Sequence, residues 1–136
     1  MTLPAATKAA GMCFAFPDVC LTPAPPAPPV PVPYPNTAML PQATNVVMNV
    51  LIENKECFVQ GSVIPMSRGD EPGVNGGVVS GINMGPVMPR QFSSKVFFGG
   101  RKAVYHTCMT GHNGVSSNQP MGTHTVPSQM KVIVAM

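Results

Sequence analysis

A strand unit recurs three times along this chain, as Asn49-Val50-Leu51-Ile52-Glu53-Asn54-Lys55, Lys95-Val96-Phe97-Phe98-Gly99-Gly100-Arg101 and Lys131-Val132-Ile133-Val134-Ala135-Met136. Each copy consists of a polar residue, a β-forming apolar triplet, and then a turn or the end of the sequence. The pairs Glu53-Asn54 and Gly99-Gly100 suit two-residue hairpin turns. Three copies of one strand unit in a short chain predict a pseudo-threefold arrangement of strands.

The composition around these units favours strands and turns over helices. The chain has 136 residues, which is the size of one domain. Only 10% of the residues are charged, against about 25% in an average domain. There are 17 prolines and 13 glycines, which break long helices and favour short strands joined by turns. We therefore predict an all-β fold with little or no helix.

Two segments outside the strand units are unusual. Residues 1–12 are expected to form a flexible leader ahead of a single domain over residues 13–136. Residues 23–35 read Pro-Ala-Pro-Pro-Ala-Pro-Pro-Val-Pro-Val-Pro-Tyr-Pro, which excludes a helix or a central strand and predicts extended polyproline II. This segment is either a stiff linker or docking ligand, or an arm along the domain surface, and its continuation into an apolar strand favours the arm. The glycine-rich residues 66–90 are too long for a free loop in a compact domain, so we expect backbone hydrogen bonds to order them.

All three histidines of the chain lie near its C-terminus, in His106-Thr107-Cys108-Met109-Thr110-Gly111-His112 and at His124. Three imidazoles and one thiolate are the ligands of a closed tetrahedral zinc site, which is structural rather than catalytic. His106 and Cys108 are two residues apart and face the same side of a strand. The sequence therefore predicts a Zn²⁺ site, with iron as the alternative because His and Cys suit both metals. The plainer interpretation is polar surface histidines and a buried cysteine.

Several classes of protein do not fit this sequence. The eight basic residues are scattered, with Arg101-Lys102 the one adjacent pair, whereas a nucleic-acid binder usually has a basic stripe. The sequence contains no stretch of 18 apolar residues, so stable insertion into a membrane is not expected. The N-terminus lacks the hydrophobic region of a signal peptide. The four cysteines are therefore expected to be reduced in a cytosol.

The chain resembles the PAAR-like family, in the branch marked by a Pro-Ile/Val-Pro-Tyr-Pro-Asn motif. It carries this motif as Pro31-Val32-Pro33-Tyr34-Pro35-Asn36. Further matches are Phe14-Ala15-Phe16-Pro17-Asp18-Val19-Cys20, Ile64-Pro65-Met66-Ser67-Arg68-Gly69-Asp70, Ser94-Lys95-Val96-Phe97-Phe98-Gly99-Gly100, Met109-Thr110-Gly111-His112-Asn113-Gly114 and Pro127-Ser128-Gln129-Met130-Lys131-Val132. These motifs run in order from about residue 11 to the end of the sequence.

This resemblance implies a fold and a function. Members of the family are small β-rich cones with pseudo-threefold symmetry that form the tips of contractile injection machines, chiefly type VI secretion. The base of the cone sits on a trimeric VgrG-type spike protein, one tip per trimer, and a metal ion is held at the point by His and Cys. The resemblance thus implies a non-enzymatic, metal-stabilised tip that caps and sharpens the spike. Such a tip resides in the bacterial cytoplasm before firing and is then translocated.

The resemblance supports the four candidate ligands unequally. The literal Pro-Ala-Ala-Arg signature is absent, and His112 is the candidate that the family match supports best. His106, Cys108 and His124 rest on their local chemistry. Cys20 follows Asp18 by two residues and is a reserve ligand. Cys13 and Cys57 lie in apolar strand contexts and are expected in the core.

Other functions fit the sequence less well than a spike tip. A metalloenzyme needs an acid or base beside the metal, and no Asp or Glu lies between residues 72 and 136. A zinc-binding adaptor recognised through residues 23–35 is the main alternative. The sequence ends just after the third strand unit, so a stand-alone tip is expected. It would carry any effector or adaptor non-covalently.

Overall fold

The computed structural model describes residues 2–135 and is all-β, as the sequence predicts. In this part of the chain the helical content is one 3-10 turn, Leu40–Gln42, and no helix is long and apolar enough to cross a bilayer. The strands are β1 (Thr2–Pro4), β2 (Met12–Ala24), β3 (Ala27–Met39), β4 (Val47–Ile52), β5 (Lys55–Cys57), β6 (Met88–Pro89), β7 (Phe97–Phe98), β8 (Arg101–Lys102), β9 (Met109–His112), β10 (Gln119–Val126) and β11 (Ile133–Ala135).

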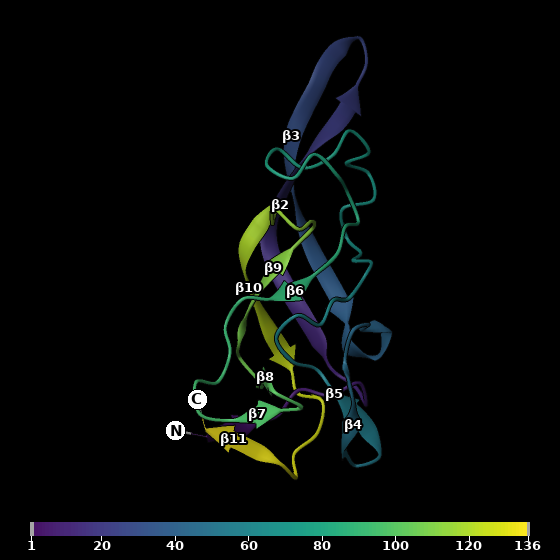
Figure 1. Ribbon diagram of the computed structural model, residues 1–136. Coiled ribbons are helices and arrows are strands. Elements are labelled where there is room, and N and C mark those ends of the chain that lie inside the picture. The colour runs from purple at the N-terminus through teal and green to yellow at the C-terminus, as the bar shows by residue number, and fades with distance from the viewer. Residues whose placement is uncertain (1, 136) are drawn as a thin grey trace.

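The strands build a cone with a narrow and a wide end (Figure 1). The hairpin of β2 and β3 rises to the point and belongs to an antiparallel sheet with the order β3-β2-β10-β9-β6. Three two-stranded sheets, β1-β11, β4-β5 and β7-β8, lie at the wide end. The taper therefore follows from one long hairpin that stands on three short pairs of strands.

The three small sheets are the three predicted strand units. Glu53 and Asn54 connect β4 to β5 with φ of 51° and 64°, and Gly99 and Gly100 connect β7 to β8 with φ of 60° and 81°. Two successive positive φ angles match the twist that a two-residue hairpin requires. The structure confirms both hairpins and the threefold repetition of strand pairs.

The third unit pairs with a strand near the start of the chain. Leu3 of β1 lies opposite Val134 of β11. Ala5 and Ala6 are buried in the core, and Ala6 N donates to Val104 O. The structure thus differs from the predicted flexible leader over residues 1–12, of which residue 1 lies outside the described part. A lone terminal strand leaves its backbone groups unpaired, and β1 supplies the missing partner.

Residues 27–35 of the proline-rich segment belong to the edge strand β3 of the large sheet, and residues 23 and 24 end β2, so the segment is not a polyproline II arm. Leu21 N donates to Gly76 O, and Val78 N donates to Val19 O. The odd-numbered residues of β2 therefore direct their backbone groups away from β3. The pairs that bond across the hairpin are the even-numbered ones, with Thr22 opposite Val30 and Cys20 opposite Val32.

The prolines of β3 fall between these bonded positions. Pro31 lies opposite Leu21 and Pro33 lies opposite Val19, where no N–H is required. The alternation of Val and Pro is thus compatible with an edge strand. Proline on the outer edge also prevents pairing with further chains.

The glycine-rich residues 66–90 run along the large sheet, which they join as β6 at Met88–Pro89, and they are ordered by backbone hydrogen bonds, as expected. Thr37 N donates to Arg68 O at 2.8 Å, Leu21 N donates to Gly76 O at 2.8 Å, and Ile64 N donates to Val87 O at 2.9 Å. This wrapping brings residues around position 70 against β2.

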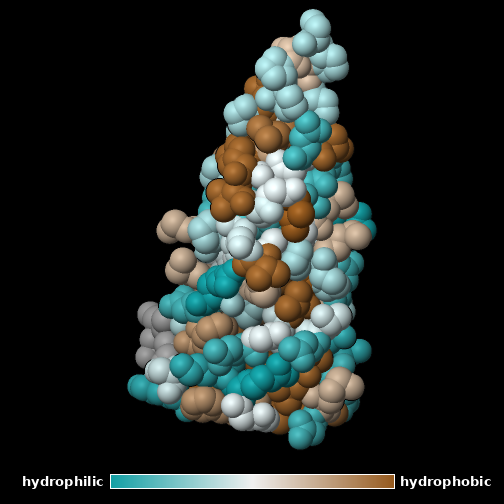
Figure 2. Space-filling view, turned by 45° about the horizontal axis from the view of Figure 1, so that its top comes forward, coloured by the Kyte–Doolittle hydropathy of each residue, from teal (hydrophilic) through white to brown (hydrophobic). Residues whose placement is uncertain are grey.

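The interior is apolar at the wide end and polar where the cone narrows. Phe58, Tyr105, Leu40 and Ile64 are the largest members of the apolar cluster. On the face shown in Figure 2, hydrophilic residues predominate around the wide end, and hydrophobic residues gather along the flank above it. Higher along β2, the buried side chains are mainly Asp, Asn, His, Ser and Thr. This second, polar interior contains the candidate functional site.

Candidate functional site

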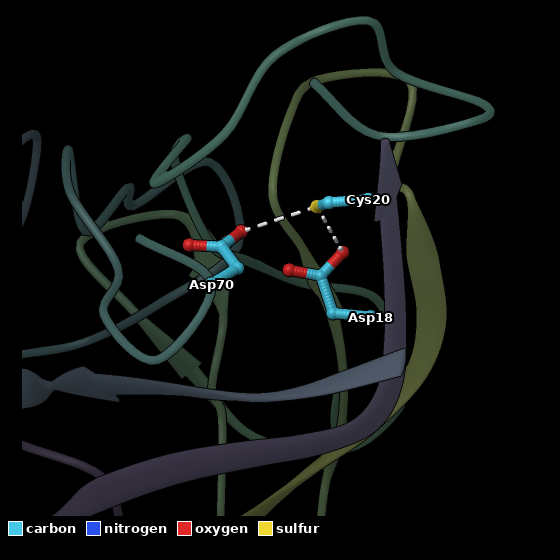
Figure 3. Close-up of side chains that lie close together, drawn as sticks. All are labelled: Asp18, Cys20 and Asp70. Carbon is cyan, nitrogen blue, oxygen red and sulfur yellow. Dashed lines mark hydrogen bonds between the residues drawn. The ribbon is translucent and has the colours of Figure 1, made fainter. Parts of the chain in front are cut away.

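Asp18, Cys20 and Asp70 form a buried group in the narrowing part of the cone (Figure 3). Asp18 and Cys20 are two residues apart on β2, so their side chains share one face of the strand. Asp70 approaches this face from the glycine-rich segment. Cys20 Sγ lies 3.7 Å from Asp18 Oδ1 and 3.7 Å from Asp70 Oδ2.

A glycine makes room for this approach. A Cβ on Gly73 would lie 2.3 Å from Cys20 Cβ, which is far inside the contact distance of two carbon atoms. The turn after Asp70 can therefore pack against Cys20 only if residue 73 has no side chain.

Neutral amides supply the hydrogen bonds of the two carboxyl groups. Asn36 Nδ2 donates to Asp18 Oδ2 at 3.2 Å and to Asp70 Oδ2 at 3.5 Å. Asn113 Nδ2 donates to Asp18 Oδ1 at 3.2 Å, and Asn118 Nδ2 donates to the same oxygen. Among residues 2–135 the one ion pair joins Lys131 and Glu53, so neither buried carboxyl group has a cationic side chain as partner.

This environment shifts the protonation of the group. Burial raises the pKa of Asp70 to about 7, and the neighbouring Asp18 adds to the shift, while the backbone N–H of Met84 opposes it. Burial also raises the pKa of the Cys20 thiol to about 12, with contributions from Asp18 and Asp70. Without a cation, the site therefore favours a bound proton, because two buried carboxylates repel each other and are poorly solvated. A bound cation would neutralise the same negative charge.

The three side chains offer a metal-ligand set. Among residues 2–135 they are the one group of three His, Cys, Asp or Glu side chains whose ligand atoms all lie within 4.8 Å of one another. Carboxylate oxygen and cysteine sulfur are both ligands that Zn²⁺ accepts, at about 2.0–2.3 Å. The residues thus fit a divalent metal ion by donor type and by proximity.

The sequence prediction placed the metal elsewhere, at His106, Cys108, His112 and His124. The structure does not bring these four residues together. His112 is buried on β9, where Nδ1 lies 2.7 Å from Asn36 Oδ1 and Nε2 lies 2.8 Å from Thr110 Oγ1. Both ring nitrogens are engaged, and burial lowers the pKa of His112 to about 4. His112 therefore orients the side chain of Asn36 by a hydrogen bond, and Asn36 in turn contacts both carboxyl groups of the buried site.

The other three candidates lie nearer the wide end. The rings of His106 and His124 are 5.8 Å apart and almost perpendicular, and Cys108 Sγ accepts a hydrogen bond from Tyr105 N. His124 Nε2 and Ser128 Oγ are buried without a hydrogen-bond partner. A metal at these residues stays a prediction. Cys13 and Cys57 belong to the apolar core, as expected.

Two of the three clustered residues, Asp18 and Asp70, are not among the ligands that the sequence predicts. Cys20 is the reserve ligand of that prediction. Their signal is weak: Asp70 is 50 residues from Cys20, and only the spacing Asp18-x-Cys20 is local. The chain has only five acidic residues, and the available indication was that two of them, Asp18 and Asp70, lie in motifs shared with the PAAR-like family.

Comparison with known proteins adds two findings. The sequence profile of the toxin PAAR-like domain matches residues 11–122. The chain is 40% identical over 109 residues to the DNase toxin Tse7 of Pseudomonas aeruginosa PAO1, a match that covers 75% of this chain and 28% of that protein. The chain therefore spans little more than a quarter of that relative. No solved structure matches this chain.

Proposed function

This chain belongs to the toxin PAAR-like domain family, and on that basis we propose that it is a non-enzymatic tip of a contractile injection apparatus. The tip caps and sharpens a trimeric VgrG-type spike of a type VI secretion system or a related machine. The observation that carries this proposal is the pseudo-threefold wide end, where three two-stranded sheets surround the base of one long hairpin. A threefold spike offers three equal contacts to such a base.

The build of the cone supports this role. The point is a hairpin of two 13-residue strands, β2 and β3, and its edge is closed to further pairing by proline. The apolar core lies at the wide end, because a narrow cone has too little volume for one. The narrowing part is held by buried hydrogen bonds instead.

A metal ion is part of the proposal. Asp18, Cys20 and Asp70 would hold it, and Zn²⁺ suits their oxygen and sulfur donors, with iron as the alternative. When bound, the ion cross-links β2 to the glycine-rich segment and contributes folding free energy. The ligands of the sequence prediction, His106, Cys108, His112 and His124, form the competing assignment.

The metal assignment is tested by the metal content of purified, untagged protein. Wild type and His124→Ala are expected to carry a similar amount of zinc, and Cys20→Ser and Asp70→Asn are expected to carry little. Loss of zinc in His124→Ala with retention in Cys20→Ser would move the site to the histidines. If wild type carries no metal, the proposed metal site is wrong.

The DNase activity named for the relative is not assigned to this chain, because the match covers only 28% of that protein. The proposed tip carries an effector or adaptor as a partner. It resides in the bacterial cytoplasm before firing and is then translocated with the spike. The zinc-binding adaptor is the weaker candidate, because residues 27–39 pair with β2 along the hairpin and are not free to be recognised as polyproline II.

The capping function is tested by mixing this protein with a purified trimeric VgrG-type spike from the same organism. Size-exclusion chromatography with light scattering is expected to give one copy of this chain per spike trimer. Absence of any complex would contradict the proposed function.

A further inference from the structure

One large apolar side chain is exposed at the same position of each strand unit. Leu51 is 54% exposed, Phe97 is 52% exposed and Ile133 is 56% exposed. The three residues are the middle members of the apolar triplets Val50-Leu51-Ile52, Val96-Phe97-Phe98 and Val132-Ile133-Val134. Equal exposure at three equivalent positions is unusual for large hydrophobic residues, which are scattered singly on most surfaces.

The neighbouring residues show that these side chains point away from the core. Ile52 and Val134 are 5% and 3% exposed, and Phe98 packs against the apolar core. Because successive side chains of a strand point to opposite faces, the residue before each of these lies on the outer face. Leu51, Phe97 and Ile133, here called the apolar triad, therefore mark the outer faces of β4, β7 and β11.

The charges of the molecule gather at the same end. Six of the eight basic residues and two of the five acidic residues belong to the three small sheets or the segments beside them. These are Lys8, Lys55, Lys95, Arg101, Lys102 and Lys131, with Glu53 and Glu56. Two of the basic positions are equivalent between units: Lys95 corresponds to Lys131, and Lys55 corresponds to Arg101. The apolar triad thus lies at the end of the molecule where basic residues outnumber acidic ones.

We infer that the apolar triad is the contact set for a threefold-symmetric partner that offers three identical apolar sockets with carboxylate groups beside them. This inference rests on the proposed function, in which the partner is the spike trimer, and names the side chains and the partner chemistry of that contact. Three symmetry-related sockets require three similar side chains at similar positions, and the strand repeat supplies them. The excess of basic over acidic residues at this end attracts a partner that has acidic groups around the sockets.

The test compares binding of the trimeric VgrG-type spike by wild type and by Leu51→Ser, Phe97→Ser and Ile133→Ser. Burying one Leu, Ile or Phe side chain is worth about tenfold to a hundredfold in affinity. Each single variant is therefore expected to raise Kd by about tenfold or more, and the triple variant to abolish binding. Phe97→Leu and Ile133→Leu are expected to retain it. Raising the salt concentration is expected to weaken the wild-type complex.

The matched controls are Val79→Ser and Val115→Ser, which remove apolar side chains that are 66% and 72% exposed outside the strand units. They are expected to bind like wild type. All of these positions are exposed, so circular dichroism is expected to show the wild-type fold in every variant.

The outcomes separate the inference from the proposed function. If wild type does not bind the spike, the proposed function fails. If wild type binds and the triad variants bind equally well, the inference is overturned and the function stands. A loss confined to one of the three positions overturns the threefold contact. Self-association of wild type that the triad variants abolish would make a second copy of this chain the occupant, and would overturn the inference as well.

Discussion

Asp18 and Asp70 place two carboxyl groups out of water with only neutral donors around them. An unpaired buried charge is strongly unfavourable, so the site must hold a proton or a cation. Asn36 is central to this arrangement, since it contacts Asp18 and Asp70 and is itself oriented by His112. These residues make the narrow part of the cone sensitive to pH, and Asp18 and Asp70 belong to the group that could hold a metal ion.

The stability of the metal-free protein is expected to be highest near neutral pH. Burial lowers the pKa of His112 and of His124 from 6.5 to about 4. Between these values the unfolded chain binds protons that the folded chain does not, so stability falls as the pH drops from 6.5 towards 4. The pKa of Asp70 is raised to about 7, so the stability from its bound proton is lost as the pH rises through that value.

Thermal unfolding of EDTA-treated protein across the pH range measures this profile. The Tm of wild type is expected to decline on both sides of its maximum. Asp70→Asn has no titrating carboxyl group at residue 70, so it is expected to lose the decline just above pH 6.5, which ends near pH 7, and to keep the acidic one. The buried thiols, whose pKa values are raised from 9.0 to about 11 or about 12, still cause a decline above pH 9 in this variant. A Tm independent of pH on the acidic side would contradict the presence of two buried neutral histidines.

Gly73→Ala is expected to destabilise the fold by about 1–3 kcal/mol, because its methyl group would overlap Cys20. The control is Gly81→Asn, at a position with no atom within 4 Å of the added Cβ and a φ of +78° that asparagine tolerates. Urea unfolding of both variants gives the comparison. Equal stability of the two would show that residue 73 does not pack against Cys20.

At the residue scale, the sequence predicted that two of the cysteines lie in the apolar core. Cys13 and Cys57 are in the core, as their apolar neighbours indicated. The predicted metal site at the histidines assumes that closeness in sequence means closeness in space, and it stays a prediction. His112 instead contacts Asn36, which is 76 residues away, and no local pattern announces such a contact.

Among the elements, hairpins with their own turn were the most predictable. Glu53-Asn54 and Gly99-Gly100 carry the turn in the sequence itself, and both hairpins form. The pairing of β1 with β11 joins the two ends of the chain, so no turn signals it. The sequence predicts polyproline II for residues that form β3, because the proline content alone does not show which positions of a strand must donate an N–H group to the neighbouring strand.

Proline placement along β3 gives a matched pair of variants. Val32→Pro removes an N–H at a position opposite Cys20 that bonds across the hairpin, and is expected to lower the Tm by several degrees. Pro31→Ala changes a position opposite Leu21 that needs no N–H and is expected to keep the Tm nearly unchanged. Equal effects of the two substitutions, measured by circular dichroism, would contradict the register of β2 and β3.

The N-terminal strand is expected to be essential for the wide end. Deleting residues 2–7 removes the partner of β11 and the buried Ala5 and Ala6. The loss of strand pairing and core packing is expected to lower the Tm by about 10 °C or to prevent folding. Thermal unfolding of the shortened chain checks this. A Tm equal to that of the full chain would show that these residues do not stabilise the fold, as expected of a flexible leader.

At the scale of the whole molecule, the cone has two interiors with different physics. The wide end has room for an apolar core, and the narrow part relies on hydrogen bonds and a candidate metal site. The wide end repeats one strand unit three times, whereas the point is a single hairpin. Such a molecule presents a threefold face at one end and an asymmetric point at the other.

The most direct test of the capping role is cryo-electron microscopy of this chain bound to its trimeric VgrG-type spike. We expect one copy per trimer, with β1-β11, β4-β5 and β7-β8 facing the spike and the β2-β3 hairpin pointing away along the spike axis. A complex in which the hairpin contacts the spike, or in which each spike subunit binds its own copy on the side, would contradict the account.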